Sequence, residues 1–261
     1  MSKTKANNYY EFEESSEDFL KNLGTINQTL LGLYQTHYRQ FGPEIKKTGG
    51  LAKVKTAWPF YLYLDEYRYR MSLFNILVLD TGELNYNWGR NLNPESISAV
   101  TLMQLYDEQG GTQNEYFKLF LHQFEEKINR DLKRTVYIIP DVLHKVPVKH
   151  HNADYISVHN YMLAKGSNLI RSELQLLSID CIFAMGQSAS SEQILKDVIG
   201  DYKKLKITGV DRLYRVVATG IETPIIQAPS VQFITVMNKT DYLISIFEEI
   251  IIDELRLRLN N

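Results

Sequence analysis

The sequence predicts an α/β fold, a three-layer α/β/α sandwich around a short, mainly parallel central sheet. Four short apolar runs each end at a polar or glycine-bearing loop, and stretches with helical spacing separate them. The runs with their loops are FNILVLD-TGELN, TVYIIPDVLHKVP, SIDCIFAMGQSAS and TPIIQAPS, which begin at Phe74, Thr135, Ser178 and Thr223. Because open α/β sheets bind ligands beyond the carboxyl ends of their strands, we expect function in the loops that follow these runs.

Helices are expected before and between the strands. A capping box at Ser15 and Asp18 opens a long amphipathic helix that reaches Tyr34, whereas the lysine-rich segment Phe41–Ala57 is expected to be an exposed loop. Further helices are expected at Pro59–Tyr69, Asn93–Leu105, Asn114–Leu132, Leu169–Leu177, Ser191–Tyr202 and Thr240–Leu259. We expect one domain over residues 1–261, with residues 1–70 as a mainly helical extension packed on it.

Composition narrows the class of protein. A chain of 261 residues with 44% hydrophobic and 23% charged residues can bury one large core. Cys181 is the only cysteine, which excludes an internal disulfide and favours a reducing compartment. The acidic amino terminus differs from a signal peptide, and no apolar run approaches the ~20 residues that span a bilayer. We therefore expect a cytoplasmic monomer with no membrane contact.

The four loops, in order and character, resemble those of the uracil-DNA glycosylase superfamily. The resemblance covers Phe74 to Leu259, and its strongest pieces are ELQLLSIDCIFAMGQSAS and IIQAPS. It implies a uracil-DNA-glycosylase-like fold, DNA as the partner and a catalytic loop after the first strand. It also implies a base-reading residue after the second strand, a phosphate-binding turn after the third and a His-Pro-Ser-type loop after the fourth. No cofactor is expected.

This chain departs from the family pattern at two loops. Ala228-Pro229-Ser230 stands where many members have His-Pro-Ser, so the imidazole that would stabilise the departing base is missing. Gly82-Glu83 partly matches the opening of the iron–sulfur branch, but the cluster cysteines are absent, so neither a metal cluster nor another metal site is expected. Conventional uracil excision is therefore in doubt.

Candidate catalytic residues lie in the loop after the first strand. Cleavage of a nucleotide's glycosidic bond passes through an oxocarbenium-like state, which a carboxylate beside the sugar stabilises while it orients or deprotonates water. Glu83 is the first candidate; Asn85, whose amide can position water, is the second; and Asp80, at the strand end, is the third. The alternative is that these side chains cap turns or face solvent.

The same loop carries aromatic candidates for the base pocket. Trp88 and Tyr86 are expected to contact an everted base, and Trp88 has the stacking surface that base-flipping pockets use. A packing role for Trp88 is an equally open interpretation.

Asp141, in YIIPDVLHKVP, is the candidate base reader after the second strand. The family has asparagine there, which both donates to and accepts from uracil. An ionised aspartate only accepts, which suits the exocyclic amine of cytosine and opposes uracil O4. The alternatives are a protonated aspartate, which could read another edge, and an alignment shifted by one residue, which would put Pro140 at this position. A glycosylase that removed ordinary cytosine would destroy its own genome, so we expect the substrate to be a hypermodified cytosine of phage DNA.

Phosphate contacts are expected on three further segments. Gly186, Gln187 and Ser188 end a strand and open a helix, the arrangement that presents amides and hydroxyls to an anion. Pro229 and Ser230 follow the last strand, and Lys145 lies in a basic stretch after the second. Lys203, Lys204 and Lys206 could likewise meet phosphates. For each segment, an ordinary turn or a solvated surface is the alternative.

Two classes of function follow. The first is a monofunctional DNA glycosylase in anti-phage defence, which uses water rather than an amine nucleophile. The second is a catalytically inactive DNA- or protein-binding module, which Ala228 and the unusual first loop favour. A conventional uracil-DNA glycosylase is the remaining alternative.

Overall fold

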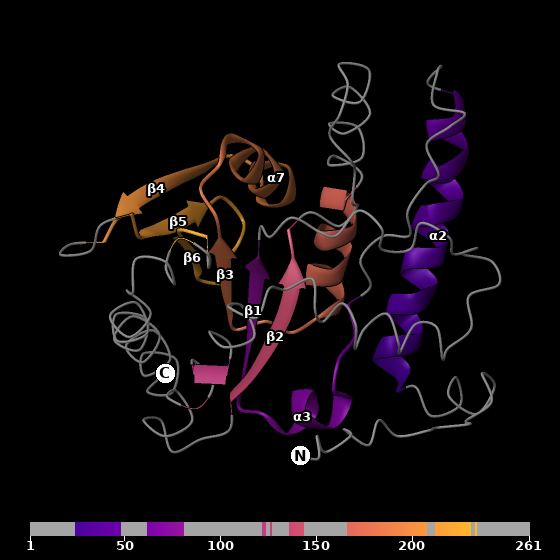
Figure 1. The fold of residues 1–261 in the computed structure, drawn as a ribbon. Coiled ribbons are helices and arrows are strands. Elements are labelled where there is room, and N and C mark those ends of the chain that lie inside the picture. Colours follow the sequence, from indigo (N-terminus) through magenta and orange to yellow (C-terminus); the bar gives the residue numbers. More distant parts are fainter. Residues whose placement is uncertain are drawn as a thin grey trace, which may run out of the picture.

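The computed structural model describes residues 24–47, 62–80, 122–123, 126, 136–143, 166–207, 212–230 and 233 (Figure 1). The described helices are α2 (Thr25–Lys47), α3 (Glu66–Met71) and α7 (Ala189–Ile199). Residues 166–176 are also helical. The strands are β1 (Phe74–Asp80), β2 (Val136–Val142), β3 (Cys181–Met185), β4 (Tyr202–Lys206), β5 (Tyr214–Ala218) and β6 (Ile225–Ala228).

The six strands form one sheet in the order β2-β1-β3-β6-β5-β4. Neighbours from β2 to β6 pair in parallel, whereas β5 runs antiparallel to both β6 and β4. The α/β class and the mainly parallel sheet are thus confirmed, and each of the four apolar runs contains a strand. The expected helices at Asn93–Leu105 and Thr240–Leu259 lie outside the described residues, as does most of Asn114–Leu132.

The antiparallel hairpin of β4 and β5 is an addition that the sequence did not predict. The expected helix Ser191–Tyr202 is instead α7, which ends at Ile199 with Gly200 as its C-cap, and Tyr202 begins β4. Gly200 has a φ of 82°, a conformation that glycine adopts at little cost and that commonly terminates a helix. The chain therefore turns back to the sheet earlier than the apolar spacing indicated.

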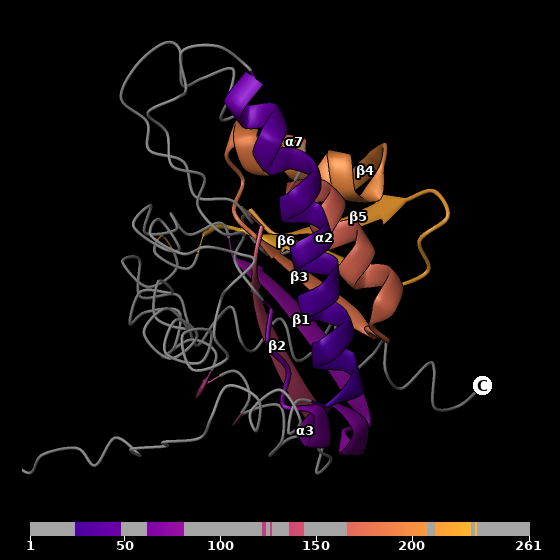
Figure 2. The ribbon, with the colours of Figure 1, turned by 90° about the vertical axis from the view of Figure 1, so that its right-hand side faces the viewer.

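Both faces of the parallel sheet are buried. One face packs against α2, residues 166–176 and α7, and its strand residues include Leu77, Leu79, Ile139 and Ile182. Figure 2 shows α2 and the 166–176 helix side by side on this side of the sheet. On the opposite face, Ile76, Val78, Phe183 and Ile226 are also buried. Burial on both faces explains why these strands appear in the sequence as continuous apolar runs.

The amino-terminal segments differ from the sequence expectation. The start expected at Ser15 lies outside the described residues, and α2 continues to Lys47, so the loop expected from Phe41 is wrong over residues 41–47. Residues 62–65 are not helical, and α3 begins only at Glu66, because the Asp65 side chain caps the Arg68 amide.

Asn27 holds the extended segment before α3 against α2. Its side-chain amide donates to the carbonyl of Leu64 at 2.8 Å and accepts from the Leu64 N–H at 2.9 Å. These two bonds satisfy backbone groups that a helix would have satisfied internally, which explains why the segment stays extended. None of the helices within the described ranges is long and apolar enough to cross a bilayer.

Candidate functional site

The carboxyl ends of β2, β1, β3 and β6 lie at one edge of the sheet, because these strands are parallel (Figure 1). From β1 the chain passes to β2 on one side, and β3 then returns to the other side of β1. The strand order therefore reverses between β1 and β3, the position where open α/β sheets form ligand crevices. Asp80 ends β1 at this point; its side chain and the loop holding Glu83, Asn85, Tyr86 and Trp88 lie outside the described residues.

The turn after β3 is joined to the end of β6. Gly186 has a φ of 117°, a conformation that L side chains rarely adopt, and its N–H donates to the carbonyl of Ala228 at 2.8 Å. The Gly186 carbonyl in turn accepts from the side-chain amide of Gln227 at 3.0 Å. The structure thus brings together the predicted phosphate turn and the predicted fourth loop, which are far apart in sequence.

Ser188 is the N-cap of α7, and its hydroxyl accepts from the Ser191 N–H at 3.2 Å. This bond satisfies one of the amides that an anion would otherwise meet at the helix start. The arrangement therefore leaves a smaller set of donors for a phosphate than the sequence alone indicates.

After β6, Pro229 is buried and the Ser230 hydroxyl accepts from the Phe233 N–H at 3.4 Å. Ala228 is fully buried in β6. Lys145 lies outside the described residues.

Arg212 connects the β4–β5 hairpin to this edge. The Gln187 side-chain amide donates to the Arg212 carbonyl at 2.5 Å, and the Arg212 guanidinium lies 4.8 Å from the centre of the Phe233 ring.

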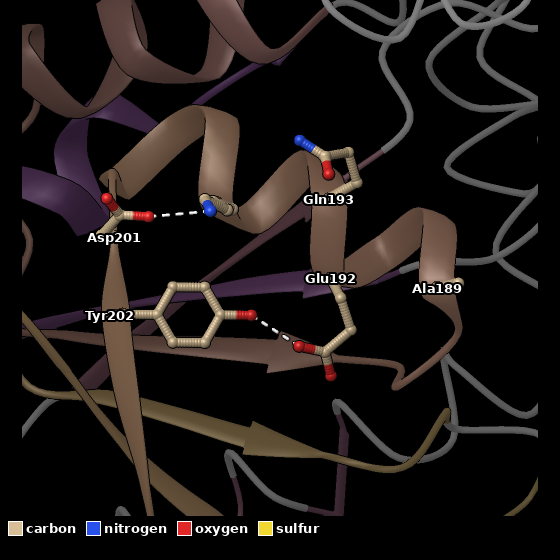
Figure 3. Close-up of a pocket in the computed structure, with 6 residues that line it drawn as sticks. Ala189, Glu192, Gln193, Asp201 and Tyr202 are labelled. Carbon is tan, nitrogen blue, oxygen red and sulfur yellow. Dashed lines mark hydrogen bonds and ion pairs between the residues drawn. The ribbon is translucent and has the colours of Figure 1, made fainter.

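A carboxylate network stabilises the first turn of α7. Glu192 accepts from Tyr202 at 2.5 Å (Figure 3). It also accepts from Gln227 at 2.9 Å and forms an ion pair with Lys204. Partial burial alone would raise the pKa of Glu192, but the hydrogen bonds from Lys204, Tyr202 and Gln227 outweigh it and lower the pKa. Burial and the Glu192 carboxylate raise the pKa of Tyr202, so its hydroxyl stays protonated and donates.

A hollow of about 350 Å³ lies between α7 and β4, next to this network. Figure 3 shows Glu192 pointing toward Tyr202. Lys196 forms an ion pair with Asp201 at 2.8 Å. Around the hollow, Glu192 bonds to Tyr202 and Lys196 pairs with Asp201, and these contacts tie α7 to the hairpin.

No family model, curated protein or solved structure significantly matches this chain. The described ranges contain no cluster of His, Cys, Asp or Glu side chains suited to a metal ion.

Asp141 lies inside β2 rather than after it, so the expected position of this residue is wrong. β2 continues to Val142, and Asp141 pairs with Leu79 in the register of the sheet. The strand tolerates Pro140 because β2 lies at the edge of the sheet, where a missing N–H costs least. In the register, Asp141 shares a row with Leu79, Ala184 and Gln227 on the face covered by α2 and α7.

The Asp141 side chain is fully buried near two other polar groups, Tyr34 of α2 and Glu173 of the 166–176 helix. The Tyr34 hydroxyl donates to Glu173 and accepts from the Leu62 N–H at 3.2 Å. Burial, followed by the charges of Glu173 and Asp141, raises the pKa of Tyr34, so its hydroxyl stays neutral. Buried carboxylates are rare in proteins. Asp141 lies one residue before the end of β2, so it is close to the carboxyl edge of the sheet.

The sequence reasoning missed Glu173, Gln227, Glu192 and Tyr34 as members of these networks. Glu173 occupies an apolar position between Ile170 and Leu177, and Gln227 interrupts the run IIQA. A polar residue on an apolar face or in a buried strand needs a partner, which is the signal that could have identified them.

Proposed function

We propose that this protein is a monofunctional DNA glycosylase that flips and excises a modified pyrimidine, by water-mediated hydrolysis of the N-glycosidic bond. We also propose a three-layer sandwich of the uracil-DNA-glycosylase type, for which burial of both sheet faces is the support. The observation that carries the functional proposal is the bond between Gly186 and Ala228, which joins the turns after β3 and β6 beside the reversal of strand order.

In this mechanism, the bond between C1′ and the base nitrogen breaks, and its electron pair leaves with the base. The carboxylate of Glu83 stabilises the positive charge that develops on the sugar, and it takes a proton from the water that adds to C1′. Asn85 positions that water, and Asp80 supports the loop at the end of β1. Trp88 and Tyr86 contact the everted base.

The choice of a hypermodified cytosine of phage DNA rests on Asp141 as an acceptor for an exocyclic amine. The proposal places the base against the carboxyl end of β2, one residue from Asp141. The sequence resemblance, which sets Asp141 at the base-reading position, carries this part of the proposal.

Separate substitutions test the catalytic assignment. Glu83→Gln, Asn85→Ala and Asp80→Asn variants are compared with the wild type for abasic-site formation and for DNA binding. We expect Glu83→Gln to lose base release by at least about a hundredfold while it binds DNA with unchanged affinity. Unchanged base release in all three variants would remove this loop from the mechanism.

An inactive binding module is the second candidate, and one observation favours it. Ala228 is fully buried in β6 and carries no group that could stabilise a departing base. In that case the wild type would bind DNA or a protein and release no base from any substrate.

A further inference from the structure

The strands β4 and β5 form a two-stranded ribbon at the edge of the sheet, called the basic ribbon here. Between Tyr202 and Ala218 the sequence has five basic residues, Lys203, Lys204, Lys206, Arg212 and Arg215, and a single acidic one, Asp211. The whole chain has a formal net charge of -2, so positive charge is concentrated in this segment. A local basic patch on an acidic protein indicates a polyanionic partner.

The two faces of the basic ribbon differ. Lys204 lies on the face of α7, where it pairs with Glu192 and stands 5.3 Å from the centre of the Tyr214 ring. On the opposite face, register places Lys203 against Val217 and Leu205 against Arg215. All four of these side chains are exposed, and Leu205 and Val217 keep 52% and 48% of their surface accessible. This face therefore presents two basic side chains around two apolar ones.

The basic ribbon is held rigidly next to the candidate site. Gln187 bonds to the Arg212 carbonyl, and the Ile207 N–H donates to the Leu213 carbonyl at 3.1 Å at the base of the hairpin connection. Tyr214 pairs with Gln227, whose amide reaches Gly186. A partner bound along the ribbon would thus be fixed relative to the turns after β3 and β6.

We propose that the exposed face of the basic ribbon binds duplex DNA, with Lys203 and Arg215 on phosphates and Leu205 and Val217 against the groove wall. The basic side chains of this face complement the charge of the phosphate backbone, and its two apolar side chains can pack against sugars and base edges. The inference rests on the proposed function for the identity of the polyanion. It adds a docking surface that positions the duplex beside the carboxyl edge of the sheet.

Lysines on an edge strand also serve to prevent strand-to-strand aggregation, so the test has to separate the two roles. Lys203→Glu combined with Arg215→Glu keeps the edge charged and repels phosphate. Arg39→Glu is the control: Arg39 is an exposed residue on α2, and Figure 1 shows α2 and β4 on opposite sides of the molecule. Circular dichroism verifies folding, and Lys203→Glu alone replaces the double variant if the latter does not fold.

The full-length protein is titrated against a labelled duplex of ordinary bases at salt concentrations between about 50 and 200 mM. We expect the double variant to bind at least about tenfold more weakly, with the slope of log K against log salt reduced by about 2. The control should stay within about twofold of the wild type. Equal binding by the double variant and the control would overturn the inference, as would binding to phosphatidylserine vesicles but not to DNA.

Base release, measured at saturating DNA, distinguishes this inference from the proposed function. If the wild type releases no base yet its duplex binding depends on Lys203 and Arg215, DNA binding by the basic ribbon is supported and the glycosylase proposal is contradicted. If bases are released and the double variant binds DNA like the wild type, the glycosylase proposal is supported and DNA binding by the basic ribbon is contradicted.

Discussion

The backbone N–H of Gly186 donates to the carbonyl oxygen of Ala228 at 2.8 Å, and this bond joins the turns after β3 and β6. Gly186 reaches it with a φ of 117°, so a side chain at this position would strain the backbone. We expect Gly186→Ala to lower the free energy of unfolding by about 1–3 kcal/mol, measured by urea denaturation.

Gly32→Ala is the matched control for that substitution. Gly32 is an exposed residue inside α2, and a Cβ there would meet nothing within 4 Å. Since alanine favours a helix interior, this variant should be more stable by about 0.5–1 kcal/mol. Equal effects of the two substitutions would contradict the special geometry of the turn.

The buried Tyr34 hydroxyl donates to Glu173 and accepts from the Leu62 amide. Tyr34→Phe removes these bonds without changing the ring, and it leaves polar groups in the core without this partner. We expect a loss of about 1–3 kcal/mol in the free energy of unfolding. Tyr67→Phe, at a residue that is 75% exposed, should stay within about 0.5 kcal/mol of the wild type. If Tyr34→Phe leaves the free energy of unfolding unchanged, the Tyr34 hydrogen bonds contribute nothing to stability.

The Glu192 network predicts a pH dependence of stability. Because the fold lowers the pKa of Glu192 below its ordinary value of 4.5, the network stabilises the protein above that pH and loses this effect as the pH falls through the folded-state pKa. The difference in the free energy of unfolding between wild type and Glu192→Gln should therefore be largest at neutral pH and decrease below about pH 4.5. Asp201→Asn, at an exposed ion pair, should show little such change. A difference that is constant with pH would contradict the ionised network.

Asp141→Asn tests base reading, because an amide can donate to uracil O4 as well as accept. If Asp141 reads the base, the ratio of uracil release to cytosine-derivative release should rise about tenfold or more. Glu173→Gln is the control, since Glu173 is also buried and lies outside the proposed base contact. If both variants lower both activities equally, Asp141 has only a structural role.

The strands were predictable because both faces of the parallel sheet are buried, which leaves apolar runs such as FNILVLD in the sequence. The strand β4 was not predictable from the sequence, because four of its five residues are exposed and three are lysines. Neither an alternating pattern nor an apolar run therefore indicates a strand there. Its pairing with β5 depends on contacts between residues distant in sequence, which local patterns do not report.

The site was predictable in part. The turn at Gly186–Ser188 and the residues Pro229 and Ser230 were located from strand ends, and the structure places them together. Asp141 was expected after the second strand, but β2 continues to Val142, because an edge strand accommodates Pro140. The roles of Gln227 and Glu192 arise from a tertiary network between α7, β4 and β6, which sequence spacing cannot show.

The most direct measurement is base release from DNA duplexes containing uracil, cytosine, hydroxymethylcytosine or its glucosylated form, detected as abasic sites and as free base by mass spectrometry. The account predicts abasic sites in the modified-cytosine duplexes with the wild type and none with Glu83→Gln. Release of uracil alone would contradict the modified-cytosine assignment, and the absence of release from every duplex would contradict the glycosylase itself.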